Sequence, residues 1–343
     1  MPPHNSTATL TPASANAATS PSTAAAILGV GAHEPEGVLS NADLEAMVDT
    51  SNTWILERTG IRERRRAGSG ETCSVMATSA ARRALARAGS PEIDLIMVAT
   101  VSADTLFPAA SCLVQRRLGM PGIPAMDING ACSGFMYGLT LADSLVRAGR
   151  VSNVLLIASE AMTTLVDYTD RSTCVLFGDG AGAVVVGGAA GGGVVASRWG
   201  ADGRDADLIY YGPDEAHDRK DAHIRMAGKG TFKQAVERLA ALARGLCDDA
   251  GWRLEDVDHV IPHQANLRIV EAAAKRTGVP MDRVIVNGDR LGNTSAASIP
   301  LAMAEADAAG RLQPGDKVLC VAFGAGSTWG GVALEWTLAP SGL

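Results

Sequence analysis

The alternation of short apolar runs with longer amphipathic stretches is the feature that most constrains how this chain can fold. From Ala24 onward, β-type runs alternate with stretches of helical periodicity, and several of these stretches end in glycine. Such alternation is typical of parallel strands joined by crossover helices, so we predict an α/β fold. Strands are expected at 26–30, 95–101, 154–159, 183–186, 194–198, 259–262, 284–286, 317–322 and 332–336, and helices at 73–88, 132–148, 231–250, 265–277 and 296–309.

The two halves of the chain resemble each other weakly. A helical stretch ending in Gly149 leads into the apolar run 151–159, and one ending in Gly310 leads into 314–323. Every α/β protein repeats this pattern, so the echo alone does not establish a duplication. We predict an N-terminal half at 24–190 and a C-terminal half at 191–343. Residues 1–23, built from Ser, Thr, Ala, Pro and Asn, are expected to form a disordered tail.

Charge and cysteine usage exclude several classes of protein. The 343 residues include 30 Lys+Arg and 37 Asp+Glu, a net charge of −7, which argues against a nucleic-acid partner. No apolar run reaches the roughly 18 residues that a membrane span needs. The six cysteines form no C-x-x-C pair and lie near no histidine at metal-ligand spacing. We therefore expect a cytoplasmic protein without a metal site, a disulfide framework or a membrane partner.

Cys132 lies at the start of the helix expected at 132–148. Its neighbours are small and would let a substrate approach closely: Gly130, Ala131, Ser133 and Gly134. The free backbone N–H groups and the positive end of the dipole at a helix N-terminus favour a thiolate, so we predict a lowered pKa and a nucleophilic role. On the residues alone, a small buried hydrophobic residue is an equal interpretation.

Two other segments carry candidate partners for this cysteine. His263 follows the apolar run 259–262, at a strand end where the ligand crevices of open α/β sheets lie. Asn293 occupies a similar turn between a strand and a helix. Taken singly, His263 is equally well a structural histidine, and Asn293 a turn or N-cap residue.

Several motifs occur in a fixed order along the chain. They are TWILERTGIRER at 53–64, ACSGF at 131–135, FGDGAG at 177–182, PHQAN at 262–266 and GNTSAA at 292–297. Together they resemble the condensing enzymes of the thiolase superfamily, most closely the β-ketoacyl-acyl carrier protein (ACP) synthase III family, from about Ala26 to Trp336. The resemblance implies a five-layered αβαβα thiolase-like fold built from two related halves, which would explain the internal echo.

The resemblance also implies a reaction that initiates fatty acid biosynthesis. Cys132 would be acylated by an acyl-CoA, with the backbone N–H groups of Cys132 and Ala325 as the oxyanion hole. His263 and Asn293 would stabilise the enolate formed when malonyl-ACP loses CO₂, and the product would be a β-ketoacyl-ACP. The asparagine, in place of a second histidine, distinguishes the starter-type enzymes from the chain-elongating ones. No metal or redox cofactor is implied.

Further site residues follow from the resemblance alone. CoA would contact Trp54, Arg58, Arg171 and Asn266, and ACP would dock on Lys233, Arg268, Lys275 and Arg276. Phe107 would close the acyl pocket across a homodimer. As single residues, the basic side chains are equally well solvated surface charges. Ala325 and Ser327 depart from the family, whose members often carry Gly and Phe at these positions.

Two alternative functions stay open at this point. A starter-unit ketosynthase of polyketide or other secondary metabolism would use the same site with another acceptor. A papain-like Cys-His-Asn hydrolase would use the same residue types, but its signature around the cysteine is absent and the strand-helix alternation suits another fold. The length and branching of the starter acyl chain cannot be read from the sequence.

Overall fold

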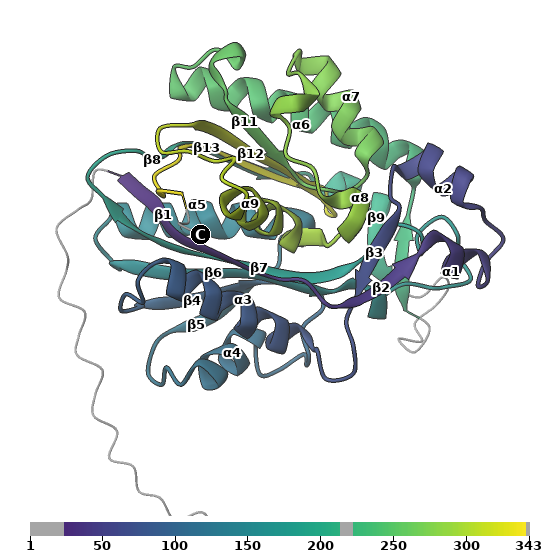
Figure 1. Cartoon of the computed structure of the whole chain (residues 1–343), viewed down its shortest axis with the longest axis horizontal. Helices are drawn as coiled ribbons and strands as arrows, with labels where there is room; N and C mark the ends of the chain where they lie inside the picture. The colour runs from purple at the N-terminus through teal and green to yellow at the C-terminus, as the bar shows by residue number, and fades with distance from the viewer. Residues whose placement is uncertain (1–23, 213–221, 341–343) are drawn as a thin grey trace, which may run out of the picture.

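A computed structural model describes residues 24–212 and 222–340 of the chain, and the tail predicted for residues 1–23 lies outside these ranges. Two β-sheets lie one above the other, with helices outside each sheet and between the two (Figure 1). The resulting order of layers is α/β/α/β/α, as predicted.

The first sheet has the strand order β1-β7-β6-β4-β5. These strands are β1 (Ala24–His33), β4 (Leu95–Ala99), β5 (Ala125–Ile128), β6 (Asn153–Ala161) and β7 (Asp179–Ala189). β4 runs parallel to β5 and β6, whereas β7 runs antiparallel to β1 and β6. β6 is apolar and buried along nearly its whole length, because helices cover both faces of the sheet.

The second sheet has the order β11-β12-β13-β8. Its strands are β8 (Gly193–Ala201), β11 (His259–Pro262), β12 (Lys317–Gly324) and β13 (Thr328–Glu335). β12 is parallel to β11 and antiparallel to β13, and β13 is antiparallel to β8. The series β8-β13-β12-β11 therefore repeats the directions of β1-β7-β6-β4. The division of the chain at residues 190 and 191 stays a prediction.

Each helical layer covers a defined sheet face. In Figure 1, α3 (Cys73–Arg87) and α4 (Ala110–Leu118) lie outside the first sheet, and α6 (Gly228–Ala250) and α7 (Leu267–Thr277) lie outside the second. Between the sheets lie α5 (Gly134–Arg147) and α9 (Ser298–Ala308). One apolar cluster joins both sheets to α5 and α9, so the two halves share a core.

Shorter elements frame the site at one end of the sheets. They are α1 (Asn41–Glu45), α2 (Asn52–Thr59), α8 (Gly288–Leu291), the paired strands β2 (Gly37–Ser40) and β3 (Glu63–Arg66), the paired strands β9 (Ile209–Gly212) and β10 (His223–Met226), and the single-turn 3₁₀ helices η1 (Ala131–Ser133) and η7 (Ser295–Ala297).

The sequence-based assignment of elements needs two corrections. Parallel strands joined by crossover helices were expected, but both sheets are mixed, because β7 and β13 run antiparallel to their neighbours. The strand expected at 284–286 is a single bridge between Val284 and Val260. Pro262 has no N–H with which to extend that pairing, and the Gln264 side chain donates to the Ile285 carbonyl instead, at 3.1 Å.

Candidate active site

Cys132 lies in η1, immediately before α5 and facing the end of β12. The neighbouring Ala131 has a φ of 46°, an uncommon conformation for a residue with a side chain, and it shapes the turn that presents the cysteine. A Cβ on Gly324 would lie 2.8 Å from the backbone nitrogen of Cys132, so only glycine allows β12 to approach this closely. The nucleophile candidate is thus held where the two halves of the molecule meet.

The pKa of Cys132 differs from the expectation. Burial, together with the smaller effect of the negative charge of Glu160, raises the pKa of the thiol to about 12, while Ser295 and the cysteine's own N–H act in the opposite direction. Cys132 keeps part of its surface exposed along the two cavities that it lines, yet the effect of a helix N-terminus, at most about 2 kcal/mol, does not offset the effect of burial on this thiol. The predicted lowered pKa is therefore wrong for the free protein, in which Cys132 is a neutral thiol at pH 7.

His263 directly follows β11 and is buried, with 2% of its surface exposed. Its backbone N–H donates to the Val321 carbonyl at 2.8 Å, and its ring Nδ1 lies 2.7 Å from the Ser298 hydroxyl. The Ser298 oxygen also accepts the Gln264 N–H at 3.3 Å. When the Ser298 hydroxyl donates to Nδ1, Nε2 carries the ring proton and is the nitrogen that can donate to a ligand. Burial lowers the pKa of His263 to about 3, so the ring is a neutral hydrogen-bond donor.

Asn293 is held by its backbone and by one end of its side chain. Its N–H donates to the Leu176 carbonyl at 2.8 Å, and its carbonyl accepts the Gly178 N–H at 3.1 Å. The side-chain Oδ1 accepts the Ser295 N–H at 2.9 Å, which fixes the orientation of the amide. The Nδ2 group is the end that remains for a ligand.

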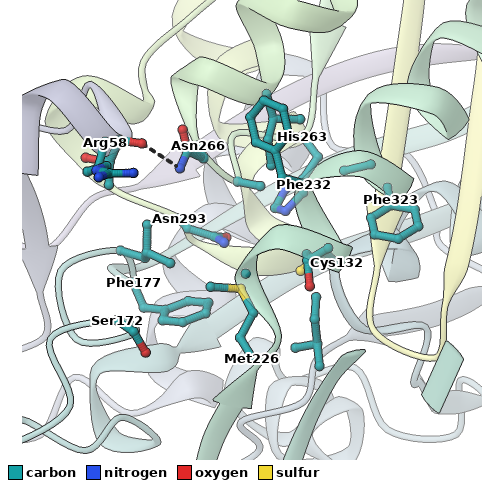
Figure 2. Close-up of a pocket in the computed structure, with 18 of the residues that line it drawn as sticks. Arg58, Cys132, Ser172, Phe177, Met226, Phe232, His263, Asn266, Asn293 and Phe323 are labelled. Carbon is teal, nitrogen blue, oxygen red and sulfur yellow. Dashed lines mark hydrogen bonds between the residues drawn. The ribbon is translucent and has the colours of Figure 1, made fainter. Parts of the chain in front are cut away.

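These three side chains, from elements far apart in the sequence, line one cavity (Figure 2). Cys132 also lines a second cavity, which contains Leu165, Phe177 and Ala325. Each cavity encloses about 1060 Å³ of empty space, open solvent at the mouths included. The thiol thus lies between a cavity that also holds His263 and Asn293 and one that does not.

The four residues expected to contact CoA lie together at the mouth of the first cavity. Trp54, Arg58 and Asn266 line it. The Arg171 guanidinium lies over the Trp54 ring, 5.1 Å from its centre. The Asn266 side chain is already engaged, because its Oδ1 caps α7 and its Nδ2 donates to the Arg58 carbonyl at 3.2 Å, as Figure 2 shows. Direct binding of a ligand by Asn266 therefore requires it to release one of these partners.

Of the residues expected at the oxyanion hole and the acyl pocket, Ala325 lies beside Cys132, whereas Phe107 lies on the surface. Ala325 follows β12 and lines the second cavity beside Cys132. Ser327 is buried and donates to Asp205 at 2.9 Å, so its side chain points toward that carboxylate. Phe107 lines neither cavity of its own chain, and 81% of its surface is exposed.

The surface expected to dock ACP carries charges of both signs. Arg268, Lys275 and Arg58 surround a shallow depression outside the mouth of the first cavity, together with Glu57 and Glu271. Arg268 donates to the Glu57 carbonyl at 3.0 Å and lies 3.6 Å from the Glu271 carboxylate. Exposed Lys233 and Arg276 lie on α6 and α7, which pack together. The patch is basic but partly neutralised.

Residues that the sequence analysis did not single out complete the site. Ser298 holds the His263 ring, Gly324 admits the close approach to Cys132, and Ser295 and Glu160 lie beneath the thiol. The serines lie in and just after the GNTSAA motif, so the motif itself was a signal for them. Glu160 is the only charged residue of β6 and lies next to its last residue, and that isolated charge was the available signal.

Two observations on the described part of the chain bear on other kinds of site. Within residues 24–212 and 222–340, no three His, Cys, Asp or Glu side chains gather in a way that could hold a metal ion. None of the helices described is both long and apolar enough to span a membrane.

The sequence is similar to family models and to proteins of known function. The family model for the C-terminal part of 3-oxoacyl-ACP synthase III matches residues 247–336, and the companion model for 3-oxoacyl-ACP synthase III matches residues 126–203. The β-ketoacyl-ACP synthase III of Alkalilimnicola ehrlichii is 45% identical, covering 91% of this chain and 99% of the relative.

Two crystal structures show the same fold. The 3-oxoacyl-ACP synthase III from Aquifex aeolicus VF5 is 46% identical with a TM-score of 0.87, covering 91% of this chain and all of that one. The priming β-ketosynthase from the R1128 polyketide pathway is 35% identical with a TM-score of 0.89, covering 94% and 99%.

The five-layered fold and these relatives define an acyltransferase of the thiolase-like condensing class. Within that class the chain belongs to the β-ketoacyl-ACP synthase III family. The prediction of such an enzyme in the initiation of fatty acid synthesis is confirmed. The polyketide alternative is not favoured, since identity to the priming ketosynthase is lower, and the papain-like hydrolase is excluded by the fold.

Proposed function

We propose that the protein transfers the acyl group of an acyl-CoA to Cys132 and condenses it with malonyl-ACP. The observation that carries this assignment is the meeting of Cys132, His263 and Asn293 in one cavity. The sulfur attacks the thioester carbonyl, CoA leaves, and the N–H groups of Cys132 and Ala325 stabilise the oxyanion. The second cavity beside the thiol receives the acyl chain.

In the second half-reaction, malonyl-ACP loses CO₂ to give an enolate. The neutral His263 ring donates from Nε2, and Asn293 donates from Nδ2, to the enolate oxygen. The carbanion attacks the acyl group on Cys132, the C–S bond to Cys132 breaks, and a β-ketoacyl-ACP is released. The departing Cys132 thiolate then takes up a proton from water to regenerate the thiol. The acyl transfer, the loss of CO₂ and the carbon–carbon bond formation involve no change of oxidation state, and the thioester carbonyls and these side chains supply each step, so the proposed mechanism calls on no cofactor.

Mass spectrometry of the intact protein tests the first step. After incubation with a panel of acyl-CoAs, the protein should gain one acyl mass on Cys132 and release one CoA, and the chain that loads fastest identifies the starter. A protein that gains no acyl mass from any member of the panel would refute the assignment.

The indole of Trp54 is proposed to stack on the adenine of CoA, in the place where Arg171 now lies over the ring. Stacking of a base on an aromatic ring is worth about 1–3 kcal/mol. We therefore expect Trp54→Ala to raise KM for acyl-CoA about tenfold or more, with little change in kcat, and Trp54→Phe to retain most of the affinity. An unchanged KM in steady-state assays of Trp54→Ala would remove Trp54 from the CoA site.

The patch of Lys233, Arg268, Lys275 and Arg276 is proposed to dock acidic ACP beside the cavity mouth. We expect Arg268→Glu to raise KM for malonyl-ACP about tenfold, because it adds repulsion at a surface that Glu57 and Glu271 already weaken. Acyl transfer from CoA, measured separately, should stay unchanged. Arg253→Glu, at an exposed arginine elsewhere, is the control. Equal loss of both half-reactions in Arg268→Glu would contradict the docking role.

A homodimer is proposed because Phe107 and Leu106 expose large apolar side chains that serve no cavity of their own chain. In a dimer, Phe107 would close the acyl pocket of the partner subunit. A cytoplasmic location is proposed with it, supported by six cysteines that are all free. Sedimentation analysis tests the dimer.

A further inference from the structure

A fully buried arginine links two walls of the first cavity without lining it. Arg64, in β3, has none of its surface exposed. Within the described part of the chain, its guanidinium donates to three neutral oxygens: the Leu39 carbonyl at 3.3 Å, Asn41 Oδ1 at 2.7 Å and the Val175 carbonyl at 2.5 Å. Burial lowers the pKa of Arg64 to about 10, so the guanidinium is still charged at pH 7 and depends on these acceptors. Hydrogen bonds from a charged donor are roughly twice as strong as neutral ones, and the planar fork fixes their directions.

The buried side chain of Asn41 connects this arginine to α2. Its Oδ1 accepts from Arg64, and its Nδ2 donates to Asn52 Oδ1 at 2.9 Å and to the Ile61 carbonyl at 3.0 Å. A guanidinium can only donate and a carbonyl can only accept, so these partners determine the orientation of the amide. Asn52 is the first residue of α2, and Ile61 lies just beyond its C-terminal cap. One amide therefore holds both ends of the helix that carries Trp54.

The segment 171–177 forms the other end of this link. Val175, whose carbonyl accepts from Arg64, lines the first cavity, as does Trp54 on α2. From the same segment, the Arg171 guanidinium lies over the Trp54 ring, 5.1 Å from its centre. The spacing between α2 and this segment therefore sets the gap between the indole and Arg171, which is where the adenine of CoA is proposed to stack.

Two glycines hold the stem of Arg64 in place. A Cβ on Gly292, whose φ is 73°, would lie 2.7 Å from the Arg64 Cβ, and a Cβ on Gly178 would lie 3.2 Å from the same atom. Only glycine at position 292 allows this approach. Gly292 directly precedes Asn293, whose N–H donates to the Leu176 carbonyl at 2.8 Å. The stem is thus packed against the turn that presents Asn293, and the guanidinium reaches both walls of the cavity from a fixed position.

On the basis of the CoA contacts proposed above, we propose that Arg64 is a positioning residue. Through Asn41, it holds α2 and the segment 171–177 at the spacing that the nucleotide of acyl-CoA requires. Arg64 touches no substrate atom and acts through Trp54 and Arg171. Its effect is therefore confined to substrates that carry the nucleotide. A pantetheine thioester of the same acyl group reaches Cys132 without these contacts, so the preference for the CoA thioester measures the geometry that Arg64 maintains.

Loading of Cys132 from two thioesters tests this role. They are the acyl-CoA that loads fastest and the pantetheine thioester of the same acyl group, and release of the free thiol is measured. We expect the wild type to load acyl-CoA with a kcat/KM at least about tenfold higher, because only CoA offers a base to stack. Arg64→Met, which keeps an unbranched stem but donates nothing, should raise KM for acyl-CoA about tenfold with little change in kcat. Its kcat/KM for the pantetheine thioester should stay near that of the wild type.

Asn41→Ala tests the same link without removing a charge. It frees both ends of α2 from Arg64, so it should also raise KM for acyl-CoA and spare the pantetheine thioester. The double variant Arg64→Met with Asn41→Ala should be no worse than Arg64→Met, because residues of one hydrogen-bond network do not act additively. Asn41→Ala carries the test by itself if Arg64→Met yields no folded protein. A double variant whose KM change equals the product of the two single changes would contradict the link.

The controls separate positioning from a general loss of structure. Arg66→Met removes an exposed arginine of the same strand and should leave the loading of both thioesters unchanged. Arg64→Lys keeps the charge but lacks the fork, so it should recover only part of the affinity for acyl-CoA. If Arg64→Met or Asn41→Ala left KM for acyl-CoA unchanged, or lowered kcat/KM equally for both thioesters, the positioning role would be overturned. A wild type that loads both thioesters equally well would instead refute the proposed CoA contacts, whatever the variants do.

Discussion

Replacing Cys132 by alanine is expected to abolish formation of the acyl-enzyme and to lower kcat for condensation by at least about 10⁴-fold, the scale of losing a covalent nucleophile. The sulfur lies between the cavity that holds His263 and Asn293 and the cavity assigned to the acyl chain, and among residues 24–212 and 222–340 no other thiol lines either cavity. Cys132→Ser should also fail to load, because a serine hydroxyl is far less acidic and less nucleophilic than a thiol. The measurement is the mass of the intact protein after incubation with acyl-CoA.

Cys112→Ala is the matched control for this experiment. Cys112 is exposed on α4, outside the site, so its removal should leave acyl loading unchanged. If Cys132→Ala still gained one acyl mass and Cys112→Ala did not, the nucleophile would be wrongly assigned.

The strands that could be predicted from the sequence are those whose burial produces a clear pattern of apolar residues. β6 and β12 are nearly continuous apolar runs because both faces of each sheet are covered by helices. β3 (Glu63–Arg66) is three arginines and a glutamate, and β5 (Ala125–Ile128) carries Asp127 at a sheet edge, so neither shows that pattern. Strand direction also left no signal, since antiparallel β7 is as apolar as the strands beside it.

The sequence motifs predicted which candidate residues the fold brings together, but not the electrostatics around them. Cys132, His263 and Asn293 stand in recognisable motifs, and they line one cavity. The sign of the thiol pKa could not be read from a helix start, because it depends on how much water the fold excludes and on the charge of Glu160, which is distant in sequence. In the same way, the mixed charge around Arg268 comes from Glu57 on another helix.

Replacing His263 by alanine is expected to slow the decarboxylation of malonyl-ACP by about 10²–10³-fold, the typical effect of removing one oxyanion donor. Asn293→Ala should have an effect of the same size. Acyl loading from CoA should continue near the wild-type rate, because neither donor acts on the Cys132 thioester. The measurement compares CO₂ release from malonyl-ACP with acyl loading in the same preparation.

The pH dependence separates a neutral donor from a proton-transferring histidine. Because burial lowers the pKa of His263 to about 3, the ring is neutral from about pH 5 to 9, and decarboxylation should show no inflection from it there. An imidazolium donor would instead make the rate fall as pH rises past its pKa. His259→Ala, at a histidine 3.5 Å from Asp316 and outside both cavities, should leave both half-reactions intact. The two cavities meet at the sulfur, so the His263 ring could in principle act on either half-reaction. If His263→Ala lost acyl loading and decarboxylation to the same extent, the ring would act on Cys132 and not on the enolate.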